Sequence, residues 1–269
     1  MMPTLARRCL TVAATAGTAA ALTLAASGAA HAASVNYVAL GDSYASGVGA
    51  GNYTSSSGSC DRSTNAYPQL WANANSPSSF DFVACSGATT ADVLSSQVSA
   101  LSSSTTLVSL TIGGNDLGFS SIMETCVLEG TSACVSAIDS AESSARSTLP
   151  AKLDNVLSTI AADAPNAKVV VTGYPEFYDL SQSSSCVGLS GTSRTAIDGG
   201  ADVLDGVIQT AAAKYGDTFV DVRSAFSGHE ICDSNSWLHS LNFLDISESY
   251  HPTAAGQSGA YYPSFSAGA

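Results

Sequence analysis

The segment Gly41-Asp42-Ser43-Tyr44 constrains this chain more than any other, because it stands directly behind the apolar run at residues 35–40. The run predicts a buried first strand, and open α/β sheets bind ligands at the carboxyl ends of their strands. The hydroxyl of Ser43 is therefore expected at such an edge. It becomes a nucleophile only when a base, an orienting group and donors for a developing negative charge join it.

Further apolar or β-branched runs recur along the chain, and helical patterns separate them. The expected strands are 36–40, 80–84, 107–112, 168–173 and 218–222, and the expected helices are 65–74, 90–101, 134–162 and 195–215. Strand–helix alternation predicts a three-layer α/β/α domain with a parallel sheet that is covered on both faces. Pro150 predicts a kink or a break in the third helix, and residues 252–269 are expected to form a short helix and a tail.

The first 32 residues have the pattern of a secretory signal peptide. Arg7 and Arg8 precede a stretch of small and apolar residues at 10–26, and Ala30-His31-Ala32 fits the small-x-small cleavage rule. A transmembrane anchor is the alternative, but the stretch is short and ends in a cleavage site. We expect residues 1–32 to be removed and residues 33–269 to form a single secreted, extracellular domain.

An acidic surface limits the partners of the chain. Nine Lys and Arg stand against 22 Asp and Glu, which gives a formal net charge of −13. Such a surface repels nucleic acid and anionic membranes. No later segment approaches the roughly 18 apolar residues of a membrane span. We therefore expect no nucleic-acid partner and no stable membrane insertion.

Six cysteines remain once Cys9 leaves with the signal peptide, and an even number in an exported chain predicts disulfides. Six cysteines allow 15 pairings. Pairing of sequence neighbours gives Cys60–Cys85, Cys126–Cys134 and Cys186–Cys232. Zinc is the alternative, but it needs a C-x₂₋₄-C spacing that the chain lacks. We expect no metal and no other cofactor.

Two glycine-containing blocks follow the second and third expected strands. Gly87 lies in the block 85–89, where a glycine lets its N–H approach a ligand, and Asn115 lies in the block 113–116 with a side-chain amide donor. The alternatives are a turn with Thr89 capping a helix, and a cap at Asn115 for a helix that starts near Leu117. Together with the N–H of Ser43, these donors predict an oxyanion hole.

One of the histidines behind the signal peptide is placed to act as a base. His251 stands just before Pro252, which predicts a helix start, so its ring is presented from a fixed loop. As a general base it takes the proton of Ser43 and returns it to the leaving alcohol. His229 and His239 lie in a loop-like stretch and are expected to be structural. Asp42 adjoins the nucleophile, but we expect it to point away and to hold the loop.

The four residues Ser43, Gly87, Asn115 and His251, in this order, resemble the four blocks of the GDSL family, also called SGNH hydrolases. The likeness covers essentially the whole mature chain, and the combination of blocks is highly specific. The opening Tyr-Val-Ala-Leu-Gly-Asp-Ser and the block spacing look most like secreted actinomycete lipases and phospholipases A1. The resemblance implies a flavodoxin-like fold whose five-stranded sheet has the order 2-1-3-4-5.

The chain departs from the family pattern at one position. The family usually has Asp three residues before the histidine, whereas this chain has Glu248. The Glu248 side chain is one candidate to orient His251. In some similar enzymes a backbone carbonyl does this, which implies the carbonyl of Ser249 and a Ser–His dyad. We favour the carbonyl, because it fixes the imidazole tautomer without a buried charge.

The resemblance implies an esterase that hydrolyses fatty-acyl lipids, as a triacylglycerol lipase or a phospholipase A1, through an acyl-Ser43 intermediate. A carbohydrate esterase that removes acetyl groups and a secreted binding module without catalysis are the alternatives. We expect the protein to be a monomer.

Two segments are expected to wall an acyl groove, with ordinary core packing as the alternative. They are Leu117, Phe119, Ile122, Met123, Val127 and Leu128 on one side and Tyr174, Pro175, Glu176, Phe177 and Tyr178 on the other. No long amphipathic insert suggests a lid, so strong activation at a lipid interface is not expected.

Overall fold

Five parallel strands form one sheet in the order β2-β1-β3-β4-β5, which confirms the order that the family resemblance implies. The strands are β1 (Asn36–Gly41), β2 (Ser79–Phe82), β3 (Leu107–Thr111), β4 (Lys168–Thr172) and β5 (Thr218–Val220). The computed structural model describes Met1, residues 34–182 and residues 186–269, and residues 34–269 form a unit of their own. The signal peptide predicted for residues 1–32 lies outside the described residues, apart from Met1, and stays a prediction.

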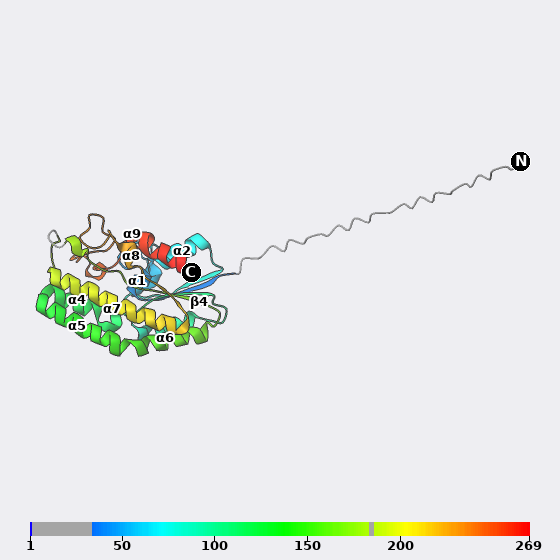
Figure 1. Ribbon diagram of the computed structural model, residues 1–269, viewed down its shortest axis with the longest axis horizontal. Coiled ribbons are helices and arrows are strands. Elements are labelled where there is room, and N and C mark those ends of the chain that lie inside the picture. The colour runs from blue at the N-terminus through cyan, green and yellow to red at the C-terminus, as the bar shows by residue number, and fades with distance from the viewer. Residues whose placement is uncertain (2–33, 183–185) are drawn as a thin grey trace. The chain divides into compact units, whose positions relative to one another are not determined.

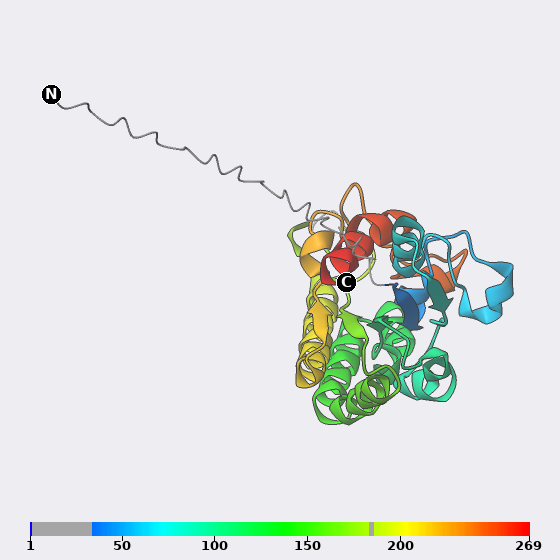
Figure 2. The ribbon, with the colours of Figure 1, turned by 90° about the vertical axis from the view of Figure 1, so that its right-hand side faces the viewer.

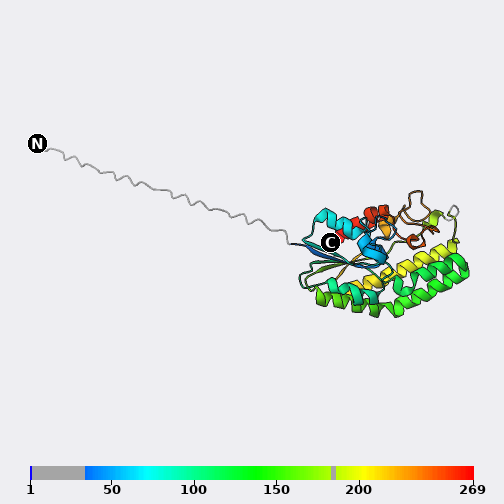
Figure 3. The same cartoon turned by 180° about the vertical axis from the view of Figure 1, so that it is seen from behind.

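Helices cover both faces of the sheet. Figure 1 shows α4 to α7 below the sheet and α2, α8 and α9 above it, and Figures 2 and 3 show the same two layers from the side and from behind. The longer helices are α2 (Tyr67–Asn75), α4 (Phe119–Leu128), α5 (Thr131–Ser147), α6 (Leu149–Asp163), α7 (Gly191–Tyr215) and α10 (Tyr262–Gly268). The shorter helices are α1 (Ser43–Ser46), α3 (Thr90–Asp92), α8 (Arg223–Phe226) and α9 (Ala254–Gly256). The 3₁₀ and π turns are η1 (Ser55–Cys60), η2 (Val93–Gln97), η3 (Val98–Ala100), η4 (Asn115–Leu117), η5 (Leu180–Gln182), η6 (Ile246–Glu248) and η7 (Gln257–Tyr261).

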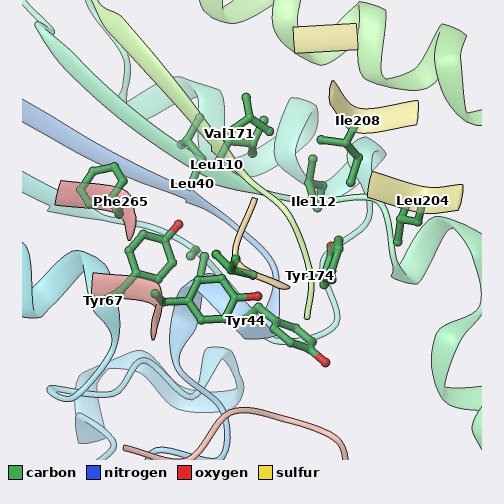
Figure 4. Packing of buried hydrophobic residues seen from close by; sticks show 14 of the residues in the cluster. Leu40, Tyr44, Tyr67, Leu110, Ile112, Val171, Tyr174, Leu204, Ile208 and Phe265 are labelled. Carbon is green, nitrogen blue, oxygen red and sulfur yellow. The ribbon is translucent and has the colours of Figure 1, made fainter. Parts of the chain in front are cut away.

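Two apolar layers enclose the strands, one on each face. Figure 4 shows Leu204 and Ile208 of α7 on one side and Phe265 of α10 on the other. Tyr37 of β1 lies on the α10 side, where its ring stacks on Phe265 at 5.7 Å between centroids. Because parallel strands with both faces covered read as continuous apolar runs, the sequence pattern predicted this arrangement.

Tyrosine hydroxyls satisfy two of the polar side chains buried inside the sheet. Ser109 and Thr111 of β3 are fully buried. The hydroxyl of Tyr37 lies 2.7 Å from Ser109 Oγ, and that of Tyr67 lies 3.1 Å from Thr111 Oγ1. Since a buried polar group without a partner costs stability, these pairs explain how an apolar core tolerates hydroxyls.

The end of β1 is fixed by a residue that the sequence analysis did not identify. Gln97 is buried, its Oε1 accepts the N–H of Gly41 at 2.7 Å, and its Nε2 donates to the Gly41 carbonyl at 2.9 Å. Gly41 has φ of +131°, and a Cβ there would collide with the carbonyl of Thr111. The strand therefore ends at this glycine, two residues before Ser43.

The helix expected over 90–101 is present as the consecutive turns α3, η2 and η3, and Gln97 within it binds Gly41. One helix prediction needs correction. Residues 252–269 are not a short helix and a tail but are helical as far as Gly268, since Tyr261 and Phe265 are buried in the core. α4 follows the Asn115 block as a separate element. The predicted break near Pro150 is confirmed, with α5 ending at Ser147 and α6 beginning at Leu149.

Three disulfides join the loops and helices outside the sheet. They are Cys60–Cys85, Cys126–Cys134 and Cys186–Cys232, which is the pairing of sequence neighbours. Cys126–Cys134 ties α4 to α5, and Cys60–Cys85 ties η1 to the segment behind β2. Among the described residues, no helix has the length and apolar character needed to cross a membrane.

Buried carboxyl groups make the stability of the fold depend on pH. Burial raises the pKa of Asp42, Asp198 and Asp205 to about 7 each, although backbone N–H groups that bind these carboxyls oppose the shift. An unfolded Asp titrates near pH 3.9. Between about pH 4 and pH 7 the folded chain therefore binds more protons at these sites than the unfolded chain does.

We predict that the free energy of unfolding falls as pH rises through this window, because stability declines wherever the folded state holds more protons. His251, with a pKa lowered to about 4, offsets part of the effect below about pH 6.5. The melting temperature of the mature chain should be several degrees higher near pH 5.5 than near pH 8. Asp198→Asn keeps an oxygen for the N–H groups of Phe177 and Tyr178 and should flatten the profile. A melting temperature that climbs steadily to pH 8 would contradict the prediction.

Candidate active site

Ser43 is presented by a sharp turn from β1 into the short helix α1. Asp42 is the N-cap of α1, and its carboxylate accepts the N–H of Tyr44 at 3.0 Å. Ser43 is the first helical residue, so its own N–H has no acceptor within the helix. The turn thus places the Ser43 hydroxyl and a free backbone donor on the same residue. Asp42 is buried and holds the turn, as expected, and it lines the same cavity as Ser43.

The imidazole of His251 meets the hydroxyl of Ser43. His251 Nε2 lies 2.7 Å from Ser43 Oγ, although 208 positions separate the two residues. The other ring nitrogen, Nδ1, lies 3.0 Å from the carbonyl oxygen of Ser249. A carbonyl oxygen only accepts, so Nδ1 carries the hydrogen and Nε2 is left as the acceptor for the serine proton.

A strained backbone position produces this arrangement. Tyr250, between Ser249 and His251, has φ of +65°, a region that bulky residues rarely adopt. Two hydrogen bonds hold it there: the Tyr44 hydroxyl donates to the Tyr250 carbonyl at 2.7 Å, and the Tyr250 N–H donates to the His239 carbonyl at 3.0 Å. The turn lets the Ser249 carbonyl fold back onto the His251 ring. Such strain is often kept at functional sites.

The carboxylate of Glu248 binds elsewhere. Its Oε1 accepts the hydroxyl of Tyr53 at 2.8 Å, and that hydroxyl also accepts the N–H of Gly49 at 2.9 Å. The structure therefore gives His251 the Ser249 carbonyl as its partner and places Glu248 in a separate contact that fastens the loop behind Gly49.

The Asn115 and Gly87 blocks are joined to each other, and Asn115 lines the same cavity as Ser43. Asn115 Nδ2 donates to the carbonyl of Ala88 at 3.0 Å, which leaves its second amide hydrogen for another acceptor. Asp116, the next residue, accepts the N–H of Thr90 at 2.8 Å and its hydroxyl at 2.7 Å. Asn115 starts the turn η4 and does not cap α4, so the alternative of a helix cap is wrong. Gly87 has φ of +77°, and a Cβ there would meet no neighbour within 4 Å.

Comparison with known proteins confirms the family that the sequence resembles. Residues 39–258 match the GDSL-like Lipase/Acylhydrolase family. The chain belongs to this family. It is 61% identical over 232 residues to Lipase 1 of Streptomyces coelicolor, covering 86% of each chain, and 54% identical over 228 residues to a lipase of Streptomyces rimosus, covering 85% of this chain and 84% of that one. The crystal structure of phospholipase A1 from Streptomyces albidoflavus NA297 has a TM-score of 0.86 and 57% identity, covering 88% of this chain and all of that one.

Tyr174 links the separate blocks of this GDSL-like site. Its hydroxyl donates to Asp42 Oδ2 and accepts the N–H of Gly114 at 3.2 Å, while its own N–H donates to Asp205 at 2.9 Å. Its ring lies edge-on to Tyr44, with 5.0 Å between the ring centroids (Figure 4). One side chain from the loop behind β4 therefore touches the segments behind both β1 and β3. The sequence analysis assigned Tyr174 only to a groove wall.

A cavity of mainly apolar lining opens beside Ser43. Asp42, Ser43, Asn115 and Glu142 are its polar and charged lining residues, and most of the rest comes from α4, α5, α7 and the loop behind β4. The lining includes Leu117, Phe119, Ile122, Met123, Tyr174 and Phe177 from the expected walls, and Ile138, Ile197, Ala201 and Leu204 from α5 and α7. These last four residues were not among the predicted groove walls, because the pattern of a helix does not show which of its apolar side chains line a cavity and which pack against a neighbour.

A second, larger groove of about 480 Å³ lies on the His251 side. It shares Phe119 and Met123 with the apolar cavity and also includes Val127 and Leu128 of α4. Pro175, Glu176 and Tyr178, expected in the acyl wall, line neither space. The volume is within the usual range for pockets that hold small ligands.

The other histidines serve the loops, as expected. His239 Nε2 lies 2.8 Å from the Gly49 carbonyl, and His229 stacks on Trp237 with 3.6 Å between the ring centroids. Within residues 34–182 and 186–269, no three His, Cys, Asp or Glu side chains gather as a metal site requires.

Glu248→Ala tests which group orients His251. Because Glu248 contacts Tyr53 and not the imidazole, turnover of a soluble ester should fall by no more than about threefold, whereas His251→Ala should lose about 10³-fold or more. Tyr53→Phe breaks the same contact from its other end and serves as the matched control. A loss in Glu248→Ala that approaches the loss in His251→Ala would assign the orienting role to the carboxylate.

The pH dependence of turnover tests the environment of His251. Burial disfavours the charged ring and lowers the pKa of His251 to about 4, although the Ser249 carbonyl favours the charged form. Only the neutral ring accepts the serine proton, so activity should persist to about pH 5 and fall as pH approaches 4. The measurement is kcat/KM for a soluble ester against pH, with tryptophan fluorescence showing that the fold survives. An acid limb at the ordinary histidine value of about 6.5 would contradict the prediction.

Proposed function

We propose that the protein is a secreted, monomeric ester hydrolase that cleaves fatty-acyl lipids through an acyl-Ser43 intermediate. The observation that carries the proposal is the 2.7 Å contact between His251 Nε2 and Ser43 Oγ at the mouth of an apolar cavity. A hydroxyl paired with a neutral imidazole is the usual arrangement of an activated serine nucleophile.

The reaction uses the residues of the site in two half-reactions. His251 takes the proton of Ser43 as Oγ attacks the ester carbonyl, and the Ser249 carbonyl stabilises the ring while it is charged. The N–H groups of Ser43 and Gly87 and the amide of Asn115 donate to the developing oxyanion. His251 then protonates the leaving alcohol. In the second half-reaction a water molecule gives its proton to His251 and attacks the acyl-Ser43 ester. The bond between Ser43 Oγ and the acyl carbon then breaks, His251 returns the proton to Ser43 Oγ, and the fatty acid leaves.

The two spaces around the site accept the two parts of a lipid ester. The cavity reached from Ser43 and Asn115 is apolar and suits the acyl chain. The leaving alcohol must lie near His251, which protonates it, so the glycerol part extends along the groove on that side. Relatives named lipase and phospholipase A1 support acyl lipids as the substrate class.

A series of p-nitrophenyl esters separates this function from the alternatives. We predict higher kcat/KM for acyl chains of about eight carbons than for acetate, because each added CH₂ buried in an apolar pocket contributes roughly 0.8 kcal/mol. Activity confined to acetate would instead favour a carbohydrate esterase.

Labelling of the nucleophile is the second measurement. A fluorophosphonate should label the wild-type protein at Ser43 and should not label Ser43→Ala, whose turnover should fall by about 10³-fold or more. An unlabelled wild-type protein would favour a binding module without catalysis. Incubation with triacylglycerol and with phosphatidylcholine then tells lipase from phospholipase preference.

A further inference from the structure

Exposed apolar side chains gather at the outer edge of the groove beside His251. Leu128, at the end of α4, is 71% exposed. Phe243 and Leu244, on the loop before η6, are 82% and 99% exposed, and Ile246, the first residue of η6, is 65% exposed. Leu128, Phe243 and Ile246 also line the groove, together with His251. We call these four residues the apolar rim. A cluster of large apolar side chains in water at the mouth of a site indicates a binding surface, whereas scattered ones do not.

Hydrogen bonds within the loop that carries Phe243 and Leu244 keep its apolar side chains exposed. Asn242 Oδ1 accepts the N–H of Leu244 at 3.0 Å, and the Asn242 N–H donates to Ser249 Oγ at 2.9 Å. Asp245 Oδ1 accepts the N–H of Ser247 at 3.2 Å. The polar side chains of the loop thus bind its own backbone and neighbouring residues, while the apolar ones face outward. Figures 1 and 3 show α4 and this orange loop region at the same end of the molecule.

We propose that the apolar rim docks on the surface of a lipid aggregate of zwitterionic or neutral lipid, so that the groove opens directly onto its substrate. The proposal rests on the proposed function, because a lipid whose acyl chain enters the cavity keeps its remaining part in the groove, and the rim is where that part leaves the protein. The side chains of the apolar rim that insert into the aggregate at this point remain in contact with it. No moving lid is needed, which agrees with the absence of a long amphipathic insert.

The charge of the chain selects the type of surface. The formal net charge is −13, and acidic residues stand beside the rim: Glu124 lines the groove, and Asp245 lies between Leu244 and Ile246. Anionic headgroups repel such a surface, since like charges raise the free energy of approach. The affinity therefore has to come from apolar side chains inserted into the lipid, and it increases with the apolar area that is buried.

Leu244 gives the sharpest test, because it is almost fully exposed and does not line the groove. Ser43→Ala protein is sedimented with large phosphatidylcholine vesicles, so that binding is measured without hydrolysis. Adding Leu244→Ser should weaken binding about tenfold, and adding Leu244→Met, the matched apolar control, should leave it within about twofold. Replacing a third of the lipid by phosphatidylglycerol should weaken binding further.

Turnover separates docking from chemistry. In the protein with Ser43 intact, Leu244→Ser should lower hydrolysis of vesicles but leave kcat/KM for a soluble ester unchanged. Equal binding of Leu244→Ser and Leu244→Met, or tighter binding to anionic vesicles, would overturn the inference. An intact docking response in a protein that hydrolyses no ester would instead refute the proposed function alone.

Discussion

The contact between the Tyr174 hydroxyl and the Asp42 carboxyl is the interaction on which the rest of the site depends. Asp42 caps α1 and so sets the direction of Ser43, and Tyr174 also accepts the N–H of Gly114, next to Asn115. Both groups are buried, and burial raises the pKa of Asp42 to about 7. A buried carboxyl costs stability unless donors meet it. The buried Asp42 carboxyl would be unfavourable without its donors. Its contact with Tyr174 therefore fixes the three segments behind β1, β3 and β4 relative to one another.

The orientation of the His251 ring depends on a neutral backbone carbonyl instead of a charged side chain. A Ser–His–Asp arrangement buries a carboxylate to orient the histidine, whereas here the Ser249 carbonyl lies against Nδ1 and the nearby carboxylate binds Tyr53. The strained φ at Tyr250 makes this possible, and Tyr44 helps to hold it. With no anion beside it, a buried ring is easier to keep neutral, which agrees with a His251 pKa lowered to about 4.

Much of the fold could be predicted because its pattern is local. Continuous apolar runs give parallel strands, and Pro150 marks the start of a helix. The strand order came from the family resemblance, whereas Ser43 was placed by the apolar run before it and His251 by its position before Pro252. What could not be predicted depends on partners distant in sequence. In the sequence, Gln97 is an ordinary polar residue of a predicted helix, and only the fold brings it next to Gly41. Glu248 has the sequence position of an orienting acid, but in the structure its carboxylate binds Tyr53.

Under the proposed function, the arrangement of the two spaces lets one site serve substrates that differ in solubility. Phe119 and Met123 line both the apolar cavity and the groove. The boundary between the acyl chain and the leaving group is therefore formed by the planar ring of Phe119 and the flexible side chain of Met123. A soluble ester needs only the cavity and the Ser43–His251 pair. A lipid in an aggregate must also reach the groove, and the apolar rim lies where it enters. Recognition of the aggregate is thus separable from the chemistry, because residues such as Leu244 contact neither the nucleophile nor the groove.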